Sequence, residues 1–141
     1  MADEDGHLRG NAAFVLARLG DPRGFETLAA ILSDHAPRPI GEGVSGSTGP
    51  GRATVKQQIS ADRYYAANLL GRLKDQRGVA LLVPLLNDPD VDSIVPWSLG
   101  RIGDRRAIQP LIAQLRLDDP TKRVSAIWAL EQLKAGEGET L

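Results

Sequence analysis

Leu99-Gly100-Arg101-Ile102-Gly103-Asp104-Arg105-Arg106 is the stretch that decides the fold of this chain, because the chain repeats it. The other copies are Leu16-Ala17-Arg18-Leu19-Gly20-Asp21-Pro22-Arg23, Leu70-Gly71-Arg72-Leu73-Lys74-Asp75-Gln76-Arg77 and the shorter Leu130-Glu131-Gln132-Leu133. Their leading leucines, which are Leu16, Leu70, Leu99 and Leu130, lie 54, 29 and 31 residues apart. A period of about 30 residues is typical of a repeat protein, and the one long interval indicates an insertion.

Each copy predicts the end of one helix, a tight turn and the start of a second helix. Apolar or small residues recur at positions −4, −1, 0 and +3 from the leading leucine, which predicts a buried stripe on every first helix. Asp21, Asp75 and Asp104 stand where a side chain can cap the second helix, and Pro22 suits its first position. The repeated unit is therefore a helical hairpin.

The pattern predicts seven helices. Six of them are expected over about residues 6–19, 22–33, 54–73, 76–87, 90–102 and 120–134. The remaining helix, sixth in chain order, includes residues 108–115 and ends near 117. Pro96 falls inside the fifth, so we expect a kink between Asp92 and Trp97. Residues 135–141 are expected to fray.

The pattern Arg-x-x-Ala-Ala-x-x-Leu-Gly-x-Leu-x-Asp-x-Arg, present from Arg63 to Arg77, resembles the short HEAT-like repeats of phycobilisome lyase subunits. The resemblance covers roughly residues 8–34 and 60–134. It implies an all-α fold, an α-solenoid (superhelix) of HEAT-like helical hairpins with about three and a half repeats in a single domain over residues 1–141. Such repeats occur in scaffolds, adaptors and enzyme subunits, so the resemblance predicts the fold better than the function.

The insertion, residues 35–52, contains five glycines and three prolines, which no helix or strand interior tolerates. We expect a loop, and two alternatives stay open for it. Its composition favours disorder, whereas a connection of this length can also be an ordered binding flap.

Composition narrows the classes of function. The net charge of −1 predicts no general attraction to nucleic acid or to an anionic membrane. The chain has no cysteine, and none of its apolar runs, such as residues 79–83, is long enough to span a membrane. The start Met1-Ala2-Asp3-Glu4-Asp5 is acidic where a secretory signal is basic, so we expect a cytoplasmic location.

Several stretches imitate catalytic or ligand motifs. Residues 41–46 have the spacing of a dinucleotide loop but follow no predicted strand. Asp88, Asp90 and Asp92 resemble the start of a calcium loop without its glycine and final carboxylate, so helix capping is the preferred interpretation. His7 and His35 form no spaced pair, and the His-Glu pairs of the similar deoxyhypusine hydroxylase family are missing. We therefore expect no catalytic residue, no metal and no cofactor.

Two surfaces remain as candidate binding sites. The first helices point positions −6, −2 and +2 outward, and an aromatic stripe of Phe14, Trp97 and Trp128 results. Arg18 and Arg101 are placed to lie over the rings of Phe14 and Trp97. Each ring could equally just cover its own helix and its neighbour.

The second helices, expected to line the concave side, present the other surface. Its outward residues are small or weakly charged, with Leu81 and Leu85 beside the central row. The candidate partner-binding residues are Glu26, Ala30, Ala80, Leu81, Pro84, Leu85, Gln109, Ala113 and Arg116. Alternatively, the insertion or a second copy of the chain covers the two leucines.

The hypothesis that follows is a non-catalytic scaffold that binds a protein or peptide partner on the concave face. The alternative is an accessory subunit of an enzyme, such as a bilin (phycobilisome) lyase-like complex. Nucleic acid and membrane are not expected as partners, since the groove lacks rows of lysine and arginine. Self-association through the ends of the solenoid is a further expectation.

Overall fold

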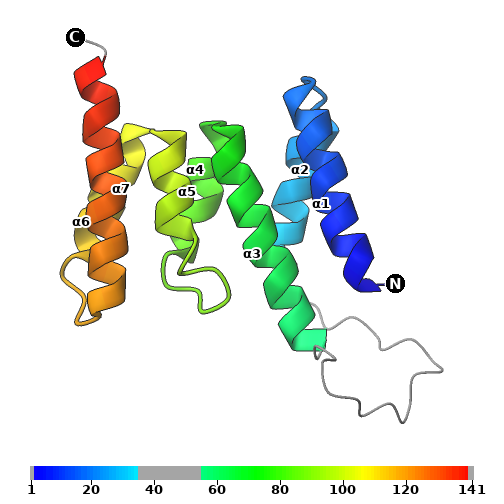
Figure 1. Ribbon diagram of the computed structural model, residues 1–141, viewed down its shortest axis with the longest axis horizontal. Helices are drawn as coiled ribbons and strands as arrows, with labels where there is room; N and C mark the ends of the chain where they lie inside the picture. The colour runs from blue at the N-terminus through cyan, green and yellow to red at the C-terminus, as the bar shows by residue number, and fades with distance from the viewer. Residues whose placement is uncertain (1, 35–54, 140–141) are drawn as a thin grey trace.

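The structure, a computed structural model, describes residues 2–34 and 55–139 of the chain. Over these residues it consists of seven α-helices and two short 3-10 helices, which confirms the predicted all-α class (Figure 1). The helices are α1 (Ala2–Arg18), α2 (Pro22–Ser33), α3 (Val55–Leu73), α4 (Arg77–Leu82), η1 (Val83–Leu85), α5 (Val95–Ile102), η2 (Arg105–Ala107), α6 (Ile108–Gln114) and α7 (Pro120–Glu139). The predicted insertion at 35–52 lies outside the described residues.

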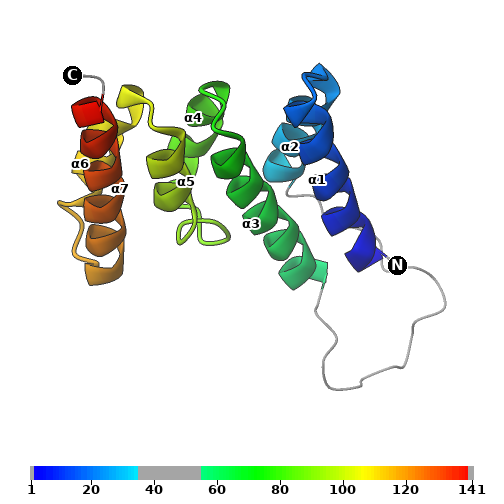
Figure 2. The ribbon, with the colours of Figure 1, turned by 45° about the horizontal axis from the view of Figure 1, so that its top comes forward.

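The helices form two rows. The first helices of the repeats, α1, α3, α5 and α7, stand side by side, and α2, α4 and α6 lie behind them (Figures 1 and 2). Neighbouring first helices contact one another, and α2, α4 and α6 each contact the first helix of the next repeat. The result is the predicted helical solenoid, in which each repeat is held by its neighbours.

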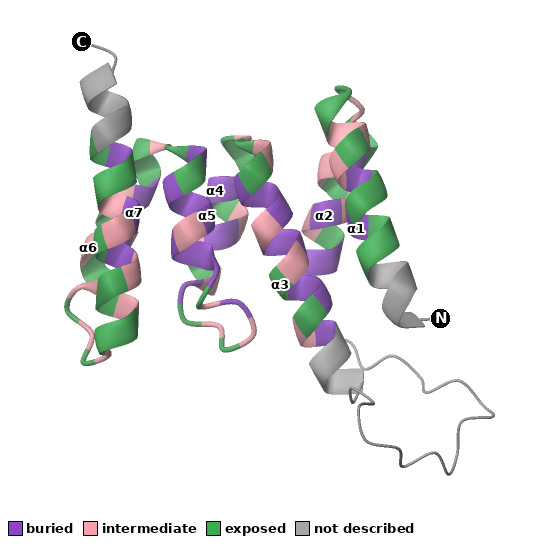
Figure 3. Cartoon of the chain, viewed as in Figure 1, coloured by how far each residue is buried: buried purple, intermediate pink, exposed green. Residues whose placement is uncertain are grey.

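The predicted buried stripe is confirmed in α3, α5 and α7. Its members there are buried or half-buried, and Figure 3 shows buried segments along these three helices. Leu70 and Leu99 are 0% exposed. The stripe is wrong for α1, because Ala12, Val15 and Leu19 are exposed. The stripe packs against the preceding first helix, and no described helix lies on that side of α1.

Two glycines let the first helices approach closely. A Cβ atom placed on Gly71 would lie 2.7 Å from the Cα of Ser98, and one on Gly100 would lie 3.1 Å from the Cα of Ala129. The buried Ser98 hydroxyl also donates to the carbonyl of Ala67, at 2.7 Å, across the same interface. The backbones of α3 and α5, and those of α5 and α7, therefore lie in close contact at these glycines.

The predicted capping contact is present at all three aspartates, but only Asp21 caps an α-helix, α2. Asp104 caps the 3-10 helix η2 that leads into α6, and Asp75 lies one residue before Gln76, the N-cap of α4. Asp21, Asp75 and Asp104 each accept the backbone N–H two residues ahead at 2.9 Å. Each also pairs with the guanidinium of that same residue, at 2.6 to 2.7 Å. These hydrogen bonds from Arg23 lower the pKa of Asp21 to about 2, and Arg77 and Arg106 lower the pKa of Asp75 and Asp104 in the same way.

Five helix boundaries differ from the prediction. Helix α1 begins at Ala2 and not near residue 6, and α4 ends at Leu82, followed by η1 to Leu85, and not near residue 87. Helix α5 begins at Val95, and Pro96 occupies its first turn, where a missing N–H breaks no hydrogen bond, so the predicted kink is wrong. Turns occupy residues 89–94 instead. Helix α6 ends at Gln114, before the predicted 117, and α7 continues to Glu139 where fraying was predicted.

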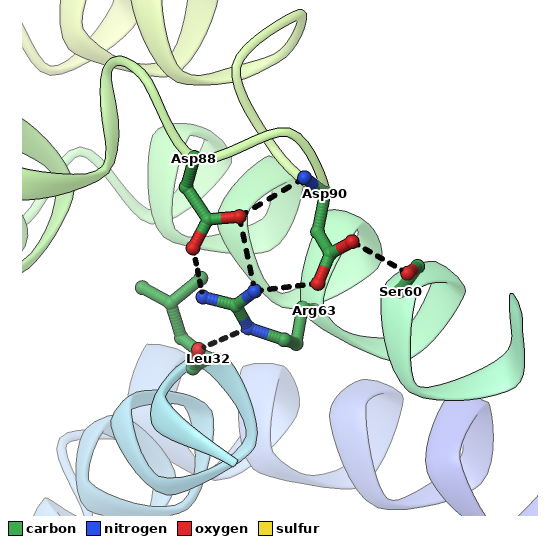
Figure 4. A network of polar contacts seen from close by, with 5 residues as sticks. All are labelled: Leu32, Ser60, Arg63, Asp88 and Asp90. Carbon is green, nitrogen blue, oxygen red and sulfur yellow. Dashed lines mark hydrogen bonds and ion pairs between the residues drawn. The ribbon is translucent and has the colours of Figure 1, made fainter. Parts of the chain in front are cut away.

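A buried arginine joins three repeats. The side chain of Arg63, on α3, is 1% exposed, and its Nε donates to the carbonyl of Leu32 at the end of α2, at 2.8 Å (Figure 4). Its two terminal nitrogens bind the carboxylates of Asp88 and Asp90, at 2.8 and 2.7 Å. Burial alone would lower the pKa of Arg63, but the hydrogen bonds that its guanidinium donates to the two aspartates outweigh burial and raise that pKa.

The interpretation of Asp88 and Asp90 as helix caps is wrong, because the next helix, α5, begins only at Val95. Asp88 does accept the backbone N–H of Asp90, at 3.0 Å, but this contact lies in a turn. Their carboxylates neutralise Arg63, and Asp90 also accepts a hydrogen bond from the Ser60 hydroxyl at 2.7 Å. The third aspartate, Asp92, lies 3.7 Å from the ammonium of Lys122 on α7. All three acidic side chains face cations from other repeats.

We predict that Arg63→Ala lowers the free energy of unfolding by about 3 kcal/mol. This free-energy change is at the low end of the range for breaking a buried ion pair, because the two aspartates stay partly hydrated. Urea denaturation followed by circular dichroism measures the change. Arg116→Ala, at an exposed arginine in the turn after α6, is the control and should leave the midpoint nearly unchanged. Equal effects of the two variants would contradict the prediction.

We also predict that the melting temperature falls as the pH drops from about 4 toward 2. The folded-state pKa values of Asp21, Asp75, Asp90 and Asp104 are lowered, so their stabilisation is complete above the unfolded pKa and is lost as the pH falls through the folded one. In the Asp21→Asn variant, the asparagine can still cap the helix but cannot titrate. The melting temperature of this variant should therefore depend less steeply on pH than that of the unmodified chain. A flat profile of the unmodified chain from pH 5 to pH 2 would refute this account.

Candidate functional site

A hollow of about 640 Å³ opens on the face formed by the first helices of the last three repeats. We call it the first-helix hollow. Its lining residues are Tyr64, Asn68, Arg72, Ser93, Ile94, Trp97, Val124, Ser125 and Trp128. A concave surface that mixes aromatic and polar groups is the usual form of a binding site.

Each wall of the hollow comes from one repeat. Tyr64, Asn68 and Arg72 are four residues apart on α3 and so lie on one side of that helix. Ser93 and Ile94 come from the turn before α5, and α5 itself adds Trp97. The remaining wall is α7. The close packing through Gly71 and Gly100 brings these walls together.

The two tryptophans form the aromatic part of the hollow. The rings of Trp97 and Trp128 are nearly parallel, with 14° between their planes and 6.2 Å between their centroids. The guanidinium of Arg101 lies 3.9 Å from the centroid of the Trp97 ring. Both rings are half-buried and pack against the core, so their positions are held from behind.

The polar part of the hollow carries one positive charge. Arg72 is exposed and has neither an ion pair nor a hydrogen bond within the described part of the chain. No carboxylate is among the lining residues, and Asn68, Ser93 and Ser125 add neutral hydrogen-bonding groups. The hollow therefore suits a group with an apolar or aromatic body and a nearby negative charge.

The predicted aromatic stripe is brought together only in part. Trp97 and Trp128 meet, whereas Phe14 lies on α1 and does not line the hollow. The predicted contacts of Arg18 with Phe14, at 5.7 Å, and of Arg101 with Trp97 are confirmed. Sequence reasoning missed Ser93, Ile94, Val124 and Ser125. Ser93 and Val124 occupy the same repeat position as Tyr64, which the alignment of the copies could have revealed.

The second-helix candidates lie elsewhere. They are on α2, α4, η1 and α6 and in the turn after α6, and none of them lines the hollow. Most are exposed, but Leu81 and Leu85 are half-buried and pack against the core. These two leucines therefore offer less free apolar surface than their sequence positions predicted.

Other expected features can also be placed. His7 packs against the ring of Tyr65, with 4.7 Å between centroids, and its Nδ1 lies 3.8 Å from the carboxylate of Asp62, so it joins α1 to α3. His35 and the dinucleotide-like residues 41–46 lie outside the described residues. Within residues 2–34 and 55–139, no group of three metal-ligating side chains comes together, and no helix combines the length and apolarity needed to cross a membrane.

Comparison with known proteins identifies the repeats. A family model described as HEAT repeats matches residues 55–133, and one described as PBS lyase HEAT-like repeat matches residues 8–34. The chain is also similar to the phycocyanobilin lyase subunit alpha of Synechococcus elongatus, with 37% identity over 87 residues. That match covers 54% of this chain and 32% of the relative, so the chain spans about a third of the relative's length.

Proposed function

Because the chain belongs to the HEAT-repeat family, we propose that it is a protein-interaction module without chemistry of its own. We further propose that it binds a protein or peptide in the first-helix hollow. HEAT repeats generally mediate protein interactions, and a solenoid presents extended surfaces for this purpose.

The observation that carries the proposal is the position of the two tryptophans. They are the only tryptophans of the chain, and both line the same hollow as Arg72, which has no ion pair with any residue that the structure describes. Tryptophan and arginine are the residues most enriched at the energetic centres of protein interfaces. Tyr64, 41% exposed, adds a third residue of that kind at the rim.

The chemistry of the hollow defines the expected partner. The stacked tryptophans favour an apolar or aromatic side chain, and Arg72 favours a carboxylate close to it. A peptide segment that carries a large apolar residue next to an acidic one matches both demands. The second-helix surface stays the alternative site. It is less favoured, because Leu81 and Leu85 pack against the core and leave little apolar surface for a partner.

We predict that Arg72→Glu reduces capture of the partner at least tenfold, because it places a negative charge where the hollow holds a positive one. Arg116→Glu is the matched control, since Arg116 is also an exposed arginine and belongs to the second-helix surface. Affinity purification from the source cells with both variants and the unmodified chain, quantified by mass spectrometry, measures the difference.

The two surfaces give opposite outcomes in that experiment. Loss of a protein with Arg72→Glu, and its retention with Arg116→Glu, supports the first-helix hollow. The reverse pattern would place the site on the second helices and overturn the proposal. Circular dichroism should show equal helicity for all three proteins, because both arginines are exposed.

A second candidate function is that of an accessory subunit in a bilin lyase-like complex. The 37% identity with a protein named phycocyanobilin lyase subunit alpha supports it. So does the shape of the hollow, since flat parallel rings beside an arginine suit a flat pigment that carries carboxylates.

For this candidate we predict that added phycocyanobilin quenches the tryptophan fluorescence in a saturable way, because both indoles line the hollow. Arg72→Glu should weaken the binding, and Arg116→Glu should not. Fluorescence that responds no more than that of free tryptophan at matched absorbance would sink the idea of a bound bilin. The protein-interaction proposal would survive that result.

A further inference from the structure

Helix α1 carries an uncovered apolar stripe at the N-terminal edge of the solenoid. Leu8 is 61%, Val15 55% and Leu19 78% exposed, and the exposed Ala12 lies between them. Their spacing of four, three and four residues places all of them on one side of the helix. We call these four residues the α1 stripe.

The repeat alignment shows what such residues do elsewhere in the chain. Positions −4, −1 and +3 are mostly buried in the other first helices, where they pack toward the preceding first helix. Their members there are Ala66, Leu69, Leu73, Val95, Ser98, Ile102, Ala126, Ala129 and Leu133. In α1 these positions are Ala12, Val15 and Leu19. The α1 stripe therefore has the composition of a helix contact that no described helix fills.

The opposite edge of the solenoid is built differently. In α3 and α5, the first helix of the next repeat packs on positions −3 and +1 from the leading leucine. These positions hold the buried residues Ala67 and Gly71 in α3 and Pro96 and Gly100 in α5. In α7 the same positions hold Ile127, 48% exposed, and the exposed Glu131. A helix stacked on α7 in the same way would meet two large side chains and bury a carboxylate. Head-to-tail stacking of copies is therefore disfavoured.

We propose that the α1 stripe binds the α1 stripe of a second copy of this chain, as an antiparallel helix pair around a two-fold axis. The spacing is self-complementary in that arrangement. Leu8 of one copy lies opposite Leu19 of the other, and Ala12 lies opposite Val15. Each layer of the pair thus combines two leucines, or one small and one larger side chain.

The charges beside the stripe permit this pairing. Arg9 and Arg18 flank it on opposite sides of the helix. In an antiparallel pair Arg9 approaches Leu16 of the second copy, and Arg18 approaches Asn11 of the second copy. The arginines thus do not face one another. The contact is a single helix seam, so the dimer is weak and its population depends on concentration.

Sedimentation velocity over a range of concentrations tests the pairing. The unmodified chain should shift toward the mass of a dimer as concentration rises, whereas Val15→Glu should weaken the association at least tenfold. Ile127→Glu is the control, because Ile127 is also an exposed apolar residue, 48%, and it lies at the opposite edge of the solenoid, outside the hollow. Melting temperatures of the two variants should match that of the unmodified chain, since both positions are exposed.

Disulfide trapping tests the register. The chain has no cysteine of its own, so Ala12→Cys and Val15→Cys can be made separately and mixed. The mixture should form a mixed disulfide dimer faster than either variant alone, because these two positions face each other across the axis.

Three results would overturn the proposal. They are a chain that stays monomeric at all concentrations, an association that survives Val15→Glu, and an association that Ile127→Glu abolishes. The last would indicate that the C-terminal edge takes part. The hollow lies on another face, so these results do not depend on the proposed function.

Discussion

The hydrogen-bonded ion pairs of Arg63 are the interaction on which this arrangement of repeats depends. A solenoid has no central core, so the relative position of its repeats is set by the contacts between neighbours. Arg63 binds the last turn of α2 through the carbonyl of Leu32, and it binds the turn before α5 through Asp88 and Asp90. One buried cation thus fixes two neighbours of α3 at once. Removing it leaves two carboxylates facing each other where a cation stood.

The same network positions the candidate site. Residues 88–90, held by Arg63, lead directly into Ser93 and Ile94, which form part of the hollow. Asp92 lies within reach of Lys122 on α7, so the turn is tied to both walls. With Gly71 and Gly100 allowing close packing of the helices, Trp97 and Trp128 become nearly parallel. The shape of the hollow therefore follows from contacts made outside it.

Local signals in the sequence predicted most of the fold. Capping by Asp21, Asp75 and Asp104 depends on residues two positions away, and the copies repeat it, so the hairpins could be recognised. The same reasoning failed for Asp88 and Asp90, because their partner, Arg63, lies 25 and 27 residues away. It also misjudged Pro96, since a proline suits a first helical turn and the true start of α5 had no local marker.

The candidate site was harder to predict than the fold. Periodicity identified the outward positions of the first helices, including Tyr64, Trp97 and Trp128, but it could not tell that two of the rings would meet and that Phe14 would stay apart. Periodicity also marks an apolar face without telling whether a neighbour covers it. For that reason Val15 and Leu19 were expected in the core and are exposed.

The most direct test of the central claim, that partners bind in the first-helix hollow, uses the two tryptophan indoles as probes. In a nitrogen-15 correlation spectrum the chain should give two indole N–H signals, from Trp97 and Trp128, both of which line the hollow. A captured partner, added in excess, should shift both signals and leave the backbone signals of Ala80, Gln109 and Ala113 in place. Unchanged indole signals together with shifts at those three residues would contradict the account.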